Sequence, residues 1–377
     1  IGIYVGSHTH FSEKQNRAID RFCATYDAVV ICDHTSGYYG KYKLLPTLVQ
    51  LQSDITSPFP PLDLMVHIGE ISAASFNDTI PAKEVWRVSE DGELRDPFKK
   101  LTTVFQMSEE MFFLHYGKDG CNRHVLIDEC RELFGEIYEQ IPELPFCNIW
   151  TAMQLSSRLP KGALFHMGVS NTRRCWNMFQ LPESVESACN VGCCGIDGCV
   201  STLVGASLVN PDRLCYVVVG DLTFFYDLNS LGNHHIGTNL RVMLVNNGRG
   251  TEFRLGIHHC NVFGDDADKY MAAAGHFGNK SPLLVKHYAE DLGFHYLSAT
   301  TKEEFMTALS NFTNPQLSDH SMILEVFTDS KDESEALYLM SHIQSDAKGM
   351  VRSKLKDAVR NVAGEKGINA IKKILKK

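Results

Sequence analysis

The most constraining feature of the sequence is residues 215–253, where two apolar runs flank a helical pattern of apolar residues. The runs are residues 215–219 and 240–245, and both contain several valines. A strand, a helix and a second strand in this order form a βαβ unit, whose two strands are parallel. Because parallel strands are buried on both faces, such a unit needs a larger sheet with helices on either side. The segment therefore predicts an α/β fold.

The same alternation continues along the chain in two blocks. In the first, strands are predicted at residues 1–5, 28–32, 64–68 and 85–88, with helices at 13–25 and 44–51. In the second, strands are predicted at residues 163–167, 215–219, 240–245 and 322–327, with helices at 149–159, 198–208, 288–292 and 302–309. We therefore predict two doubly wound parallel-sheet domains. Their expected limits are 1–117 for a central α/β domain, 118–146 for a helical connection, 147–345 for the second domain and 346–377 for a tail.

The composition is that of a globular protein, with 44% hydrophobic and 21% charged residues. The net charge of −9 argues against nucleic acid as a main partner. Apolar runs are too short to span a bilayer, and no secretory signal is visible. The cysteine group Cys189, Cys193, Cys194 and Cys199 contains no CxxC pair, which favours reduced thiols over a metal site. We expect a cytoplasmic protein.

Polar residues follow the two strands of the βαβ unit. Asp221 comes after the first strand and Asn247 after the second, so both are expected at the carboxyl edge of the sheet, where α/β proteins bind ligands. A carboxylate, a carboxamide and a carbonyl from the next turn suit Mg²⁺, and the N–H groups of Leu222 and Thr223 suit a phosphate. Each pair of residues, taken alone, is also typical of an ordinary turn.

Gly220-Asp221, followed about 25 residues later by Asn246-Asn247, resembles the motif of thiamine-diphosphate (ThDP) enzymes. Residues 190–198, the following Ser201-Thr202 and residues 220–229 resemble one subgroup in particular, the 2-succinyl-5-enolpyruvyl-6-hydroxy-3-cyclohexene-1-carboxylate synthases of menaquinone biosynthesis. The resemblance covers residues 145–335. Over residues 1–115 it depends on the order of the elements and on residues 33–36.

The resemblance implies a cofactor site in the second domain, which would be the diphosphate-binding domain. Asp221, Asn247 and the carbonyl of Arg249 would bind Mg²⁺, and Leu222 and Thr223 would hold the diphosphate. The other implied cofactor contacts are Gly195 through its carbonyl, Ile196 beneath the bent cofactor, and Gly220, Thr251 and Phe253. Ser170 and Arg174 fall where the family contacts a substrate carboxylate.

The resemblance also implies what this chain lacks. Family members have a further N-terminal domain that supplies the catalytic glutamate, and the chain begins at Ile1 within a strand-like run. We therefore expect a piece of a longer protein that acts as a homodimer or tetramer. Glu252 replaces a usually apolar residue near the reaction centre, so it is predicted to move a proton, the alternative being a solvent-facing loop residue.

The implied activity is decarboxylation of a 2-oxo acid and transfer of the product to an acceptor. Val191 replaces a family arginine, and residues 69–75 contain no basic residue, so we predict a substrate with fewer carboxylates than those of the menaquinone enzyme. A genuine menaquinone-pathway synthase and a non-catalytic cofactor-binding subunit remain alternatives. A dinucleotide-dependent dehydrogenase is disfavoured because no GxGxxG follows a strand.

The tail has a different character from the rest of the chain. Residues 346–377 contain ten Lys or Arg against three Asp or Glu, and their apolar residues recur at helical spacing. A basic amphipathic helix can contact an anionic membrane or an acidic partner. The alternative is a terminal helix that packs on its own subunit.

Overall fold

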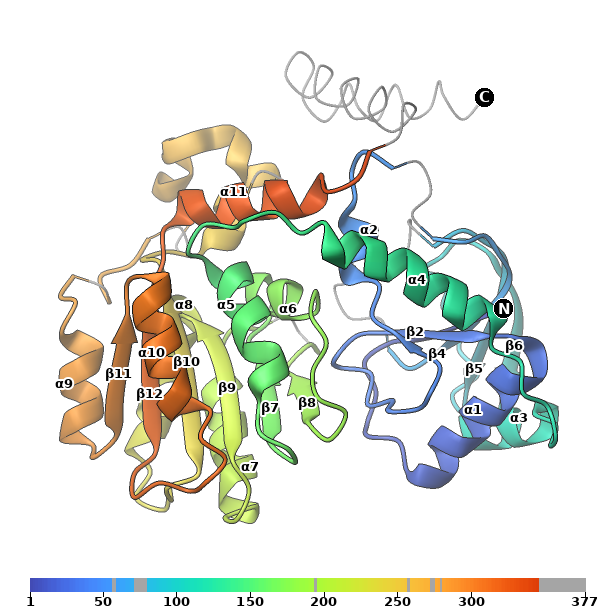
Figure 1. Cartoon of the computed structure of the whole chain (residues 1–377), viewed down its shortest axis with the longest axis horizontal. Coiled ribbons are helices and arrows are strands. Elements are labelled where there is room, and N and C mark those ends of the chain that lie inside the picture. The colour runs from blue at the N-terminus through green and yellow to red at the C-terminus, as the bar shows by residue number, and fades with distance from the viewer. Residues whose placement is uncertain are drawn as a thin grey trace.

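The computed structural model describes residues 1–55, 59–70, 80–192, 195–255, 258–271, 275–278 and 280–345. Two parallel sheets lie side by side, and helix α4 connects their domains across one end of the molecule (Figure 1). The predicted fold class, two α/β domains with parallel sheets, is confirmed. Across the described ranges, no helix combines the length and apolar character needed to cross a membrane.

The first domain has a six-stranded sheet in the order β3-β2-β1-β4-β5-β6, with every neighbouring pair parallel. Helix α1 has its N-terminus fixed by a capping box of Ser12 and Gln15. The elements are β1 (Gly2–Val5), α1 (Glu13–Tyr26), β2 (Val29–Cys32), β3 (Lys43–Leu44), α2 (Thr47–Leu51), β4 (Leu62–Ile68), β5 (Ala82–Ser89), β6 (Leu101–Gln106) and α3 (Glu109–Tyr116).

The four strands predicted in this domain are present, but the helix predicted at 44–51 is wrong at its start. Lys43–Leu44 is an edge strand, and the helix begins only at Thr47, after Pro46. The structure also adds β6 and α3, which the sequence analysis missed. Strand β6 is only half-buried, so it lacks the continuous apolar run that reveals a central strand.

The second domain also has a six-stranded parallel sheet, in the order β11-β12-β10-β9-β7-β8. Its central strands β9 and β10 are almost completely buried, as their apolar sequences predict. The strands are β7 (Leu164–Met167), β8 (Glu186–Cys189), β9 (Cys215–Gly220), β10 (Leu240–Asn246), β11 (His295–Ala299) and β12 (Met322–Phe327). The helices are α5 (Asn148–Leu155), α6 (Asn171–Trp176), α7 (Cys199–Val209), α8 (Asp221–Tyr226), α9 (Leu284–Asp291), α10 (Lys302–Phe312) and α11 (Ser330–Ser341).

Two features join the domains besides α4 (Val125–Glu139). At the end of β2, the backbone N–H of His34 donates to Asn177 Oδ1 at 3.0 Å, and Ser187 Oγ donates to the carbonyl of His34 at 2.7 Å. Helix α11 extends from the second domain to the first, where Gln52 Nε2 donates to the carbonyl of Met340 at 2.8 Å. Figure 1 shows α11 passing over α5 toward α2. The domains therefore pack as one body.

Candidate active site

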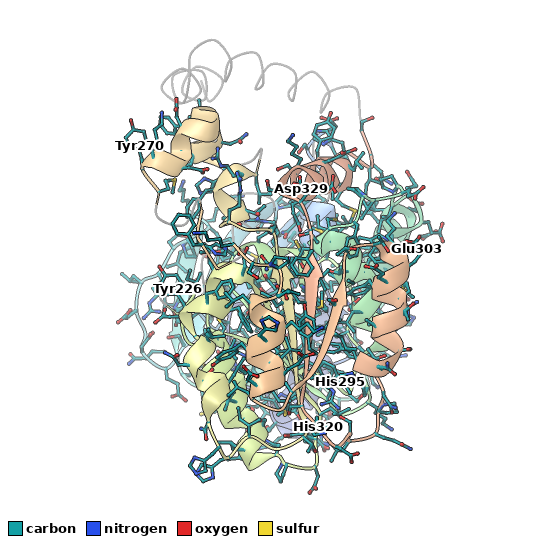
Figure 2. All side chains as sticks on the ribbon, turned by 90° about the vertical axis from the view of Figure 1, so that its left-hand side faces the viewer. Tyr226, Tyr270, His295, Glu303, His320 and Asp329 are labelled. Carbon is teal, nitrogen blue, oxygen red and sulfur yellow. The ribbon has the colours of Figure 1, made fainter. Side chains whose placement is uncertain are left out.

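A cavity of about 210 Å³ lies at the carboxyl edge of the second sheet. In Figure 2, His295 and His320, which lie at the starts of β11 and β12, are at the lower end, while Asp329, which follows β12, is at the upper end. Tyr270 lies at the same upper end, so the segment that carries it covers this edge. The cavity is lined by Asn148, residues 169–172, Ile196, residues 220–223, Val245, Asn247 and residues 249–253.

Asp221 is the charged centre of this cavity and is only 2% exposed. The chain passes directly from β9 into α8 here, so the carboxylate remains at the sheet edge. Its Oδ1 accepts from the N–H of Leu222 at 2.8 Å, and its Oδ2 accepts from the N–H of Gly248 at 2.6 Å. No lysine or arginine among the described residues pairs with it. A buried carboxylate in this state favours a bound cation.

Asn247 lies opposite Asp221, on the turn after β10. Its Oδ1 is buried and has no hydrogen-bond partner within the described structure. Gly248 has a φ of 79°, which lets the chain turn back so that Arg249 also lines the cavity. Together these residues offer a carboxylate, an unused amide oxygen and a nearby backbone carbonyl. This set of hard oxygen donors fits Mg²⁺, the ion predicted from the sequence.

The other predicted cofactor residues gather around these two. Ile196, Gly220, Leu222, Thr223, Thr251 and Phe253 all line the cavity, whereas Gly195 does not. Among the residues that the structure describes, the buried hydroxyl of Thr251 has no hydrogen-bond partner, and neither has Oδ1 of Asn148. Three unsatisfied polar atoms therefore lie in residues that line one small cavity, counting Asn247. Buried polar groups are normally hydrogen-bonded, so this concentration indicates a site for a polar ligand.

Ser170 lies on the turn between β7 and α6 and also lines the cavity. Its φ of 61° and ψ of −122° are unusual for a residue with a side chain. Strained backbone of this kind costs about 1–3 kcal/mol and is concentrated at functional sites. The strain marks Ser170 independently of the resemblance that first indicated it.

Arg174 and Glu252 form a feature that the sequence analysis missed. The guanidinium of Arg174 donates two hydrogen bonds to the carboxylate of Glu252, at 2.9 and 2.7 Å. Burial lowers the pKa of Arg174, but the bonds to Glu252 more than offset this and raise it. Both residues were predicted in the site, yet their pairing joins positions 78 residues apart in the chain. Both nitrogens that donate to Glu252 belong to the end of the guanidinium, so the pair occupies the part of Arg174 that would bind another carboxylate.

Two more residues were not predicted from the sequence. His276 has its Nε2 3.1 Å from Asp221 Oδ2, although the direction is poor for a hydrogen bond, and its ring packs on Phe225. Glu333 of α11 accepts from the N–H of Asn148 at 2.9 Å, and its burial raises its pKa to about 7. No local sequence motif predicts a role for either residue, because both contact the site from distant segments of the chain.

Within the ranges that the structure describes, no group of three or more His, Cys, Asp or Glu side chains is arranged to hold a metal. The oxygen donors described above include only one such side chain, Asp221, so they do not form this type of metal site. Of the predicted thiol group, Cys199 is buried, which raises its pKa to about 11, while Cys193 and Cys194 lie outside the described residues. The predicted tail at 346–377 and residues 71–79 also lie outside them.

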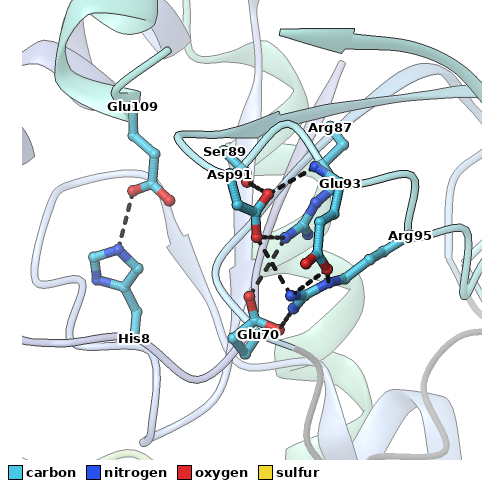
Figure 3. Close-up of polar contacts among 8 residues, drawn as sticks. All are labelled: His8, Glu70, Arg87, Ser89, Asp91, Glu93, Arg95 and Glu109. Atoms are coloured by element: carbon cyan, nitrogen blue, oxygen red, sulfur yellow. Dashed lines mark hydrogen bonds and ion pairs between the residues drawn. The ribbon is translucent and has the colours of Figure 1, made fainter. Parts of the chain in front are cut away.

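The first domain brings two arginines to the carboxyl end of β4, where residues 69–75 offer no basic side chain of their own. Arg87 of β5 pairs with Glu70 at 3.4 Å, and Arg95 pairs with Glu70 and with Asp91 at 3.3 Å (Figure 3). Glu93 also pairs with Arg95 at 2.6 Å. Two cations are therefore matched by three carboxylates, so this network has no spare positive charge for an anionic substrate.

Comparison with known proteins agrees with the fold and the site. No family model matches the chain. The 2-succinyl-5-enolpyruvyl-6-hydroxy-3-cyclohexene-1-carboxylate synthase of Bacteroides fragilis is 33% identical over 263 residues, which are 68% of this chain and 45% of that protein. The synthases of Phocaeicola vulgatus and Bacteroides thetaiotaomicron are each 32% identical, again over 68% of this chain and 44% of theirs.

Two parallel-sheet domains with an oxygen-lined cavity at one carboxyl edge define an α/β protein of the cofactor-binding kind. Over about two thirds of its length, the chain is a homologue of the 2-succinyl-5-enolpyruvyl-6-hydroxy-3-cyclohexene-1-carboxylate synthases, which are ThDP enzymes. The predicted resemblance is therefore confirmed. The chain spans less than half the length of these curated relatives.

Proposed function

We propose that this chain provides the diphosphate- and Mg²⁺-binding part of a ThDP-dependent enzyme that decarboxylates a 2-oxo acid and transfers the product to an acceptor. One observation carries the proposal. The buried carboxylate of Asp221 and the unpartnered amide oxygen of Asn247 line the same cavity at the edge of the sheet. Homology to ThDP enzymes supports the identity of the cofactor.

Asp221, Asn247 and the carbonyl of Arg249 would hold the metal, and Leu222 and Thr223 would bind the diphosphate. Asp221 Oδ1 accepts from Leu222 N–H, so this carboxylate orients the turn that would receive the diphosphate. Ile196 would support the cofactor from below. When bound, ThDP supplies the carbanion-stabilising chemistry that breaks the bond to the leaving carboxylate.

The remaining residues act on the substrate. Arg174 would orient a substrate carboxylate, and Glu252, held beside it, would move a proton at the reaction centre. Their two hydrogen bonds hold Glu252 beside Arg174 until a substrate carboxylate competes for the guanidinium and displaces Glu252. Ser170 lies at the mouth of the same cavity and offers a hydroxyl to the substrate.

The substrate class follows from the number of free cations. Within the described part of the chain, Arg249 lines the cavity and is assigned to the metal through its carbonyl, and Arg174 reaches the cavity wall through its pair with Glu252. Arg87 and Arg95 are already matched by carboxylates. We therefore propose a 2-oxo acid with fewer carboxylates than the menaquinone enzyme handles. The names of the relatives favour the alternative, a genuine synthase of that pathway.

Partners are also part of the proposal. Large apolar side chains are exposed on the second domain, including Tyr226 at 65% and Tyr270 at 82% (Figure 2). Exposed apolar surface of this kind marks sites of protein association, so a homodimer or tetramer would cover it and complete the site. The basic tail at 346–377 would contact an anionic membrane, and the protein would act in the cytoplasm. Vesicle co-sedimentation with and without the tail tests the membrane contact.

Calorimetric titration of the chain with ThDP tests the cofactor assignment directly. We expect binding in the presence of Mg²⁺ and its loss when EDTA removes the ion, because the buried carboxylate then faces the diphosphate without a cation between them. Binding that is equally tight with and without Mg²⁺ would contradict the proposed metal site. Adding 2-oxoglutarate, or a panel of simpler 2-oxo acids, to the full-length enzyme then separates the two substrate classes.

A further inference from the structure

A second cavity, of about 710 Å³, lies between the two domains and is separate from the site described above. Its walls come from three parts of the chain: residues 39–45 after β2, one face of α4, and residues 180–187 before and within β8. A ligand in it would therefore touch both domains and the helix that connects them. Its volume is within the range typical of small-molecule sites, about 300–1,000 Å³.

Three basic side chains line this cavity: Lys41, Lys43 and Arg131. None of them pairs with a carboxylate within the described part of the chain. Arg131 donates to the carbonyl of Lys41 at 2.6 Å, and Lys43 Nζ lies 5.2 Å from the centre of the Tyr39 ring. The lining also includes one carboxylate, that of Glu183, so the described wall keeps an excess of positive charge. In a chain with a net charge of −9, this excess indicates a site for an anion.

The rest of the wall is mixed, with aromatic side chains beside the polar residues His34, Gln180, Glu183 and Ser187. Phe134 and Tyr138 face the cavity from α4 together with Arg131, as expected for residues three and four positions apart on a helix. Tyr39 lies on the opposite wall, and its hydroxyl is held by the N–H of Ser187 at 3.1 Å. Aromatic rings positioned in this way offer flat surfaces against which a planar ring stacks.

Gly135 lies in the interior of α4 and also lines the cavity. A Cβ atom built at this position would meet no atom within 4 Å. Glycine in a helix interior costs about 0.5–1 kcal/mol relative to alanine. The helix therefore carries a destabilising residue where the fold has room for a larger one, and its effect is to leave the cavity open.

We propose that this interdomain cavity binds an anionic ligand with a planar ring, whose phosphate or carboxylate group contacts Lys41, Lys43 and Arg131. The ligand would also influence the active site. It would contact residues 180–187, which connect α6 to β8, and α6 begins next to Ser170. Binding there would stabilise one relative position of the two domains, and with it one position of the turn at Ser170.

Calorimetric titration of the 377-residue chain with two probes tests the proposal and separates the two sources of negative charge. AMP provides a ring with a phosphate, and 2-naphthoate provides a ring with a carboxylate. We expect at least one probe to bind with a Kd below about 1 mM and to bind more weakly at high salt. The probe that binds identifies the anionic group.

Variants decide whether the binding occurs in this cavity. Lys43→Gln and Arg131→Gln should each weaken it about tenfold, since each removes one charge-assisted contact. Gly135→Leu should abolish it by filling the space, and an unfolding temperature no lower than that of the unaltered chain would show that the variant is folded. Lys286→Gln, on α9 far from the cavity, is the matched control and should leave binding unchanged. Failure of both probes to bind, or unchanged binding in Lys43→Gln, Arg131→Gln and Gly135→Leu, would overturn the proposal.

Discussion

The two sheets have the same parallel architecture, but their carboxyl edges differ. In the first domain the edge at β1 and β4 is closed, because Ser7 and Glu70 exchange backbone hydrogen bonds of 2.7 and 3.0 Å across it. Glu70 is then tied to Arg87 and Arg95 (Figure 3). In the second domain the edge at β9 and β10 is open and keeps unsatisfied oxygen atoms. The shared fold therefore does not show which domain carries the site. The difference lies in whether the polar groups at the sheet edge are already paired.

The largest effect is expected from a variant that alters the open edge. Asp221→Ala removes the one carboxylate proposed to bind the metal, so Mg²⁺-dependent binding of ThDP should weaken at least about a hundredfold. Asn247→Ala removes a neutral ligand and should weaken it about tenfold. Calorimetry measures both, with Asp212→Ala, an exposed residue before β9, as the charge-matched control. Affinity close to that of the unaltered chain in Asp221→Ala would remove the basis for the open-edge assignment.

The second prediction concerns Glu333, a buried acid whose partner Asn148 lines the cavity at the open edge. Burial raises the pKa of Glu333 from 4.5 to about 7, so between these values the folded protein keeps a proton that the unfolded chain releases. This contribution to stability is fully present below pH 4.5 and is lost as the pH rises through 7. The loss amounts to about 3 kcal/mol. Glu333→Gln should remove this pH dependence while keeping the contacts to Asn148 and Thr328.

Urea denaturation at a series of pH values measures the effect of Glu333→Gln. Glu335→Gln, on the exposed side of the same helix, is the control and should follow the unaltered chain at every pH. If Glu333→Gln were as sensitive to pH as the unaltered chain, the buried acid would not be the source of the dependence.

The smallest effect is expected from a variant at the closed edge. The guanidinium of Arg87 is 2% exposed, and Glu70→Ala removes its nearest carboxylate, leaving Asp91 at 3.9 Å. Because Glu70 is itself 60% exposed, solvent screens part of the loss, and we expect destabilisation of about 1–2 kcal/mol. ThDP binding should not change, since the network belongs to the other sheet. Asp63→Ala, which breaks an exposed pair with Lys83, should leave the free energy of unfolding unchanged within experimental error.

The sequence predicted those parts of the site that lie within one local unit. Asp221 and Asn247 were expected at the same edge of the sheet because a single βαβ unit determines where both emerge, and both line the cavity there. The pairing of Arg174 with Glu252 was not predicted, since it depends on how the turn after β7 approaches the turn after β10. The assigned roles of these residues in metal, cofactor and substrate binding remain predictions.

In the fold, too, elements with a clear local sequence pattern were predicted, and those that depend on their place in the sheet were not. Central strands such as β10 were predicted from their continuous apolar sequence. Edge strand β8, with the sequence Glu-Ser-Ala-Cys, was missed because half-exposed strands carry mixed side chains. Residues 44–51 were assigned to a helix that includes an edge strand, since the apolar pattern of short segments does not separate the two.

Helix α11 gives the molecule a property that can be followed by hydrogen exchange. The carbonyl of Ser341, at its end, accepts from the N–H of Ser53 in the first domain at 2.8 Å, while Glu333, near its start, holds the N–H of Asn148 at the cavity. Both amides are protected from exchange by acceptors on the same helix. Lifting the helix exposes both to solvent at once, so a separation of the domains is accompanied by deprotection of an amide at the cavity wall. The two hydrogens should exchange at a common rate, as amides do when they belong to one cooperative opening unit.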